Sequence, residues 1–91
     1  MKRPFTEKQI DKFVYIRVFS EDVDEMDLVW HSDPENRNIE VIEGNGWKFQ
    51  YDDQLPFEMV DGENFVVLKN QIHRVIKGCG PLKIKLQKNI L

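Results

Sequence analysis

The chain of 91 residues contains one cysteine, and it has no apolar run of about eighteen residues. Cys79 therefore has no partner for an internal disulfide, and no segment is expected to span a membrane as a helix. The N-terminal segment MKRPFTEKQ also lacks the apolar stretch of a secretory signal peptide. These absences predict a cytoplasmic protein in a reducing environment.

Several other patterns that mark known chemistry are also missing. The formal net charge is −3 and no long basic stripe occurs, which argues against nucleic acid as a partner. No pair of cysteines is present to hold a structural zinc, and the one threonine and two serines form no nucleophile elbow. Cys79 has no general base near it in the sequence. Catalysis through a serine or cysteine nucleophile is therefore not expected.

The composition is that of a single folded domain spanning residues 1–91. Hydrophobic residues make up 41% of the chain and charged residues 32%, which supplies both a core and a surface. A chain of this length is too short for two domains. Disorder is not expected from this balance of apolar and charged residues.

The N-terminal segment has the pattern of a short helix. Thr6 is followed three residues later by Gln9, as in a capping box, and Phe5 and Ile10 can form a hydrophobic staple across the cap. We therefore expect a helix of about two turns there. The segment Phe13–Phe19 is rich in β-branched and aromatic residues, which favour a strand, although a helix continuing through it stays open.

After an acidic loop at residues 20–26, short strand-like segments recur with turn residues between them. Asn45-Gly46 and Asp61-Gly62 are typical of tight turns that need a positive φ. Alternation within the segments places apolar side chains on one face and polar ones on the other. Together with Phe13–Phe19, these segments indicate an all-β sandwich or barrel. The later segments are Asp27–His31, Asn38–Glu43, Trp47–Tyr51, Phe57–Met59, Asn64–Leu68, Ile72–Ile76 and Leu82–Gln87.

Two stretches of the sequence have a characteristic spacing. The first carries the residues His31, Asp33, Arg37 and Gly44. The second carries Gly62, Leu68, Asn70, His73 and Lys77. These intervals resemble those of the two cupin motifs, and the usual residue is kept at His31, Gly44, Gly62 and His73. The resemblance covers residues 31–77, about half of the chain. It implies a small single-domain cupin, which is a double-stranded β-helix or jelly-roll barrel, here with one short N-terminal helix.

The resemblance also implies where a metal would bind. In a metal-binding cupin the four ligands would fall at His31, Asp33, Arg37 and His73. Arg37 is a permanent cation without a lone pair, so the ordinary set of three histidines and one glutamate is not assembled. The remaining set, His31, Asp33 and His73, is of the two-histidine, one-carboxylate kind that holds Fe(II) elsewhere and leaves coordination positions open. The resemblance thus allows one mononuclear divalent metal (Fe, Mn, Ni or Zn) as a cofactor, and otherwise none.

A metal-free pocket is the alternative. Arg37 can form a salt bridge with Asp33, and a guanidinium close to a divalent cation is repelled by it. Arg37 has two further interpretations of its own. It can hold the carboxylate or phosphate of a ligand through paired hydrogen bonds, or it can be a surface ion-pair partner of Glu35 and Glu40.

Aromatic side chains of one expected strand are candidates for the wall of a ligand site: Trp47, Phe49 and Tyr51. Aromatic walls with a few polar groups are usual in small-molecule pockets. Aromatic residues that alternate along a strand are more often part of a core, and both interpretations stay open. No residue is assigned a catalytic role.

Three functions are compatible with these patterns. The first is binding of a small polar or anionic molecule in the barrel mouth around Arg37, without catalysis. The second is a metal-dependent enzyme of the dioxygenase or isomerase type that uses His31, Asp33 and His73. The third is a structural or interaction module that presents a sheet edge at Phe13–Phe19. So small a core also favours a homodimer, because pairing through sheet edges adds stability.

Overall fold

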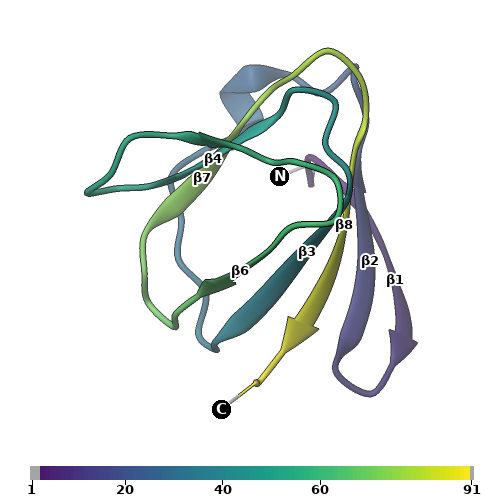
Figure 1. Ribbon diagram of the computed structural model, residues 1–91, viewed down its shortest axis with the longest axis vertical. Helices are drawn as coiled ribbons and strands as arrows, with labels where there is room; N and C mark the ends of the chain where they lie inside the picture. The colour runs from purple at the N-terminus through teal and green to yellow at the C-terminus, as the bar shows by residue number, and fades with distance from the viewer. Residues whose placement is uncertain (1–2, 91) are drawn as a thin grey trace.

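The computed structural model describes residues 3–90 and contains two antiparallel β-sheets around one core (Figure 1). The larger sheet has the strand order β1-β2-β8-β3-β6, and the smaller sheet has the order β5-β4-β7. One 3₁₀ turn, η1 (Glu25–Asp27), is the only helical segment of the described residues. The strands are β1 (Thr6–Asp11), β2 (Val14–Phe19), β3 (Arg37–Glu43), β4 (Lys48–Tyr51), β5 (Phe57–Glu58), β6 (Asn64–Val67), β7 (His73–Ile76) and β8 (Leu82–Lys88).

The core confirms the alternation expected from the sequence. Trp47 and Phe49 are buried around the start of β4, and the alternate residues Leu82, Ile84 and Leu86 are buried along β8. The lysines between them on β8 are outside the core. One face of this strand therefore closes the interior of the domain while the other meets solvent, as in an antiparallel sheet with one wet face.

The predicted N-terminal helix is wrong, because the segment is a strand. Thr6 pairs with Val18 and Glu7 with Arg17 in the antiparallel ladder between β1 and β2. A two-turn helix is marginal on its own in water, and the local capping pattern does not compete with a ladder formed along a neighbouring strand. None of residues 3–90 forms a helix long and apolar enough to cross a membrane.

Two further expectations about the strands are also wrong. The segment Asp27–His31 is not a strand: Asp24 caps η1 by accepting a hydrogen bond from the Met26 amide, and only His31 makes an isolated bridge. The segment Phe13–Phe19 does not form a sheet edge, because β2 lies between β1 and β8. The interaction module proposed for that edge loses its basis, since the paired backbone of β2 has no free ladder to offer.

An ion pair joins the first two strands on the inner side of the larger sheet. Nε and Nη2 of Arg17 lie 2.7 and 2.6 Å from Oε2 of Glu7, and both side chains are 11% exposed. Lys88 Nζ lies 3.7 Å from the other carboxylate oxygen. Burial raises the pKa of Glu7, but the charge and hydrogen bond of Arg17, with the charges of Lys88 and Arg3, lower that pKa by more. Glu7 is therefore ionised at neutral pH.

The variant Glu7→Gln is expected to lower the free energy of unfolding by about 1.5 kcal/mol above pH 5, because a charged hydrogen bond is lost. The folded-state pKa of Glu7 lies below its ordinary value of 4.5. The contribution of Glu7 is thus full above that value and is lost as the pH falls through the folded-state pKa. Urea unfolding of both proteins from pH 3 to pH 7 measures the difference. A difference that does not shrink toward low pH would contradict this account.

Candidate metal centre

The two histidines of the chain lie side by side at one end of the core. His73 begins β7, and His31 joins it through two backbone hydrogen bonds, His31 N to His73 O at 3.0 Å and His73 N to His31 O at 2.9 Å. Their ring centroids are 4.3 Å apart. This bridge brings together the only two imidazoles of the sequence, which are 42 positions apart along the chain.

Each imidazole ring is oriented by a hydrogen bond to the backbone carbonyl two residues before it. Nδ1 of His31 lies 3.0 Å from the Val29 carbonyl oxygen, and Nδ1 of His73 lies 2.7 Å from the Gln71 carbonyl oxygen. A carbonyl oxygen only accepts hydrogen bonds, so Nδ1 carries the hydrogen in each ring. The lone pair of each neutral imidazole is then on Nε2. Metal-binding histidines are commonly held in this way.

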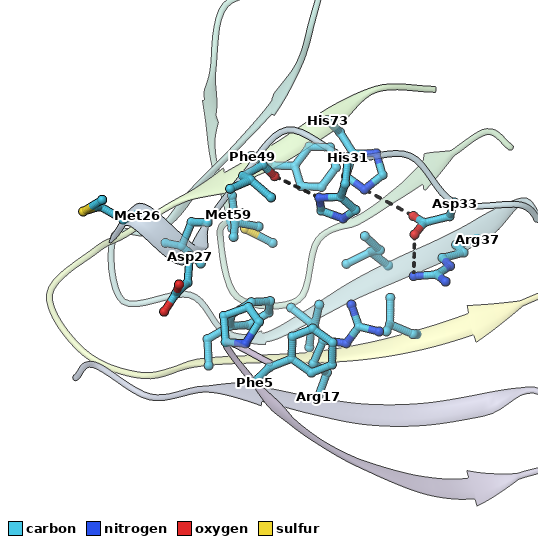
Figure 2. A pocket seen from close by; sticks show the side chains of 18 residues that line it. Phe5, Arg17, Met26, Asp27, His31, Asp33, Arg37, Phe49, Met59 and His73 are labelled. Carbon is cyan, nitrogen blue, oxygen red and sulfur yellow. Dashed lines mark hydrogen bonds and ion pairs between the residues drawn. The ribbon is translucent and has the colours of Figure 1, made fainter. Parts of the chain in front are cut away.

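Asp33 completes the group from the loop before β3. Its Oδ2 lies 3.2 Å from Nε2 of His73, and the ligand atoms of Asp33, His31 and His73 all lie within 4.8 Å of one another (Figure 2). Within the described residues, Oδ2 is the one buried side-chain oxygen or nitrogen without a hydrogen-bond partner. With Nδ1 of His73 donating to Gln71, a neutral His73 ring turns its Nε2 lone pair toward Oδ2, whereas a protonated ring donates to Oδ2. The arrangement calls for a shared proton or a cation.

The loop that carries Asp33 is fixed by the loop between β6 and β7. The Asn70 amide donates to the Asp33 carbonyl at 2.7 Å, and the Lys69 amide donates to Oδ1 of Asn36 at 2.8 Å. His73 follows the same loop by a few residues. The backbone thus holds both the carboxylate and the second imidazole in place.

The carboxyl group of Asp33 is ionised at neutral pH. Burial raises its pKa, but a hydrogen bond from His73 and the positive charge of Arg37 lower the pKa by more, to below the ordinary value of 3.8. An ionised carboxylate with one unpartnered oxygen is a ligand that a divalent ion can use.

Arg37, at the start of β3, is held between two carboxylates. Its Nη1 lies 3.3 Å from Oδ1 of Asp33, and its Nη2 and Nε lie 2.8 and 3.1 Å from Oε1 of Glu35. The salt bridge with Asp33 expected from the sequence is therefore present. Arg37 is buried, so it is not an ordinary surface ion-pair partner. Because its donors already face carboxylates, it has little left to offer an anionic ligand.

A cavity of about 250 Å³ opens beside the side chains of His31, Asp33, Arg37 and His73. Of the three aromatic residues expected to wall a ligand site, Phe49 lines the cavity, whereas Trp47 and Tyr51 are not among its lining residues. The indole of Trp47 is fully buried and donates to the Gly80 carbonyl at 2.7 Å. The Tyr51 hydroxyl donates to the Val66 carbonyl at 2.6 Å. These two residues belong to the packing of the domain.

Solved structures resemble this one over most of its length. A cupin domain from Bordetella pertussis Tohama I is 12% identical, with 97% of each chain covered and a TM-score of 0.62. A cupin-like protein from Thermotoga maritima is 18% identical, with 94% of this chain and 68% of that chain covered and a TM-score of 0.67. The chain has the cupin fold. No family model and no curated protein matches the sequence.

The cupin fold is also shared with a longer protein of known metal content. HppE in its Fe(II) form is 16% identical, with a TM-score of 0.66, and the match covers 82% of this chain. This chain spans only 41% of the length of HppE. The similarity therefore concerns the fold alone.

The structure explains which residues stand at three of the cupin motif positions. A Cβ built on Gly44 would lie 1.8 Å from the Met59 carbonyl oxygen, so no larger residue fits there. Gly62 has a φ of 87°, in the left-handed region that glycine tolerates. Asn70, where a cupin usually has glycine, has a φ of 64°, and asparagine is one of the few other residues that adopt this conformation. The backbone of the motif is kept although its residue has changed.

Several cavity residues escaped the sequence analysis, and Arg17 and Asp27 are the charged ones among them. The others include Phe5, Met59 and Val75. Arg17 lies opposite Glu7 in the ladder between β1 and β2. Reading the N-terminal segment as a helix concealed this pair, because the pair exists only when both segments are strands.

Proposed function

We propose that this protein binds one divalent metal ion through Nε2 of His31, Oδ2 of Asp33 and Nε2 of His73, and a small molecule in the adjoining cavity. The buried Oδ2 of Asp33 carries the proposal, because it lies 3.2 Å from Nε2 of His73 and has no hydrogen-bond donor when that imidazole is neutral. A cation placed among these three atoms removes the conflict. The Fe(II) described for the structural neighbour HppE supports iron as one candidate, with Mn, Ni and Zn as the others.

The three side chains would leave part of the coordination sphere to solvent or to a ligand. A bound divalent ion in such a site supplies Lewis-acid character, and a redox-active ion supplies electron-transfer chemistry as well, as in a dioxygenase or isomerase. Arg37 draws Oδ1 of Asp33 away, which leaves Oδ2 for the metal. Its charge is offset by Asp33 and Glu35 together, so its repulsion toward a cation is reduced.

Binding of a small molecule without a metal is the second candidate. It is favoured by the contact between His73 and Asp33, which becomes an ordinary ion pair when Nε2 is protonated. In that case the cavity retains its ligand-binding role and the three side chains only close one end of it. The metal content of the protein separates the two candidates.

Elemental analysis of protein purified without a histidine tag tests the proposal. After exposure to Fe(II), Mn(II), Ni(II) or Zn(II) and removal of the excess, the wild type is expected to retain about one ion per chain. The variant Asp33→Asn, which has nearly the same shape but no charge, is expected to retain far less. The variant Asp53→Asn, at an exposed turn, is the matched control and should behave like the wild type. If the wild type retains no more metal than Asp33→Asn does, the metal site is refuted and binding of a small molecule without a metal is the candidate that remains.

A further inference from the structure

A second guanidinium faces the same cavity from the opposite wall. Arg17 and Phe5 lie across the cavity from His31 and His73 (Figure 2). The Arg17 side chain is 11% exposed, and its guanidinium carbon lies 3.8 Å from the centroid of the Phe5 ring. One face of the guanidinium is thus covered by an aromatic ring, which fixes the plane of its donors.

The donors of Arg17 are only partly used. Nε and Nη2 share a single oxygen, Oε2 of Glu7, and among residues 3–90 Nη1 has no hydrogen-bond acceptor. Glu7 also has Lys88 beside it, so its one negative charge is set against two positive ones. A guanidinium carries five N–H donors, and several of these remain for a ligand. Arg37 differs in this respect, since its donors face Asp33 and Glu35.

The rest of the cavity is mostly apolar. Its walls include Phe19, Ile39, Phe49, Val75, Ile84 and Leu86. Its volume of about 250 Å³ lies below the roughly 300–1,000 Å³ of pockets for drug-sized ligands. A ligand that fits is therefore small and has an apolar body.

We propose that the ligand of this cavity is a small organic acid whose carboxylate binds Arg17 and whose hydrocarbon body lies against the apolar walls. A planar carboxylate matches the fork of donors on a guanidinium. This inference rests on the proposed function for the placement of the ligand, whose far end then points toward His31 and His73. It does not depend on the metal, because Arg17 makes no contact with the three candidate ligands among its hydrogen bonds and ion pairs.

Titration calorimetry of metal-free protein with hexanoate, and with hexanamide as its neutral counterpart, tests the assignment. Wild type is expected to bind hexanoate at least about tenfold more tightly than hexanamide, because the amide cannot form charge-assisted hydrogen bonds with Arg17. The double variant Glu7→Gln/Arg17→Gln replaces the ion pair by a neutral pair, which avoids an unpaired buried charge, and should lose this preference. The variant Arg74→Gln removes an arginine that is not a cavity residue and should retain it.

A further variant has the opposite expected effect. Glu7→Gln removes the carboxylate that competes for Arg17, so it should bind hexanoate several-fold more tightly than the wild type does. A purely structural role for Arg17 predicts no such gain.

Hexanoate binding that is equal in the wild type and the double variant would overturn the proposal. So would binding that requires Mn(II) and is indifferent to Arg17, because the carboxylate would then lie on the metal. Failure of metal retention with Arg17-dependent hexanoate binding would refute only the metal site.

Discussion

Replacing His73 by alanine is expected to lower the affinity for Zn(II) by at least about 100-fold, because loss of a ligand exceeds the roughly 10- to 100-fold cost of losing a partner that orients one. The side chain of His73 supplies one of the three atoms that the structure gathers within 4.8 Å. Its backbone bridge to His31 does not need the imidazole, so the loop geometry should persist. Titration calorimetry against wild type measures the change.

The same variant should also lose the stabilisation that the metal gives to the fold. An ion present at 100 times its dissociation constant adds about 2.7 kcal/mol to the free energy of unfolding when it binds only the folded state. Thermal unfolding with and without Zn(II) should therefore show a shift for wild type and for the control variant Asp53→Asn. A shift of the same size in His73→Ala would mean that the ion binds elsewhere.

Replacing Trp47 by alanine is expected to lower the free energy of unfolding by about 3–5 kcal/mol. The side chain is 0% exposed, lies 5.5 Å from the Phe19 ring centroid, and donates its indole N–H to Gly80. The substitution leaves a cavity and an unpaired carbonyl. Domains are stable by about 5–15 kcal/mol in total, so this loss would remove a large part of the stability of the folded state. Urea unfolding followed by circular dichroism gives the difference.

The second tryptophan of the chain is a matched control. Trp30 is 42% exposed, and its ring contacts the guanidinium of Arg74 near the surface. The variant Trp30→Ala should cost only about 1 kcal/mol, the value of an exposed cation–π contact. Equal losses in the two variants would show that burial of Trp47 does not hold the two sheets together.

The strands with strong alternation could be predicted from the sequence. Trp47 is buried just before β4 and Phe49 within β4, and Leu82, Ile84 and Leu86 are buried positions of β8. Local side-chain periodicity decides these elements because each has one buried face. The cupin spacing of His31, Asp33 and His73 likewise predicted a cluster that the structure brings together.

Contacts between distant segments could not be predicted in this way. The N-terminal segment has a local helix-capping pattern, yet its pairing with β2 decides its conformation. The position of Arg17 in the cavity wall could not be predicted for the same reason, since its partner Glu7 lies on that mispredicted segment. Arg37 was assigned several roles because its spacing does not show that Glu35 and Asp33 both turn toward it.

The central claim is that His31, Asp33 and His73 hold one metal ion at the end of the cavity. Anomalous diffraction from crystals of the untagged protein grown with Mn(II) tests it most directly. The account predicts one strong anomalous peak bonded to Nε2 of His31, Oδ2 of Asp33 and Nε2 of His73. A direct contact between Oδ2 of Asp33 and Nε2 of His73, with no anomalous peak near these atoms, would contradict it.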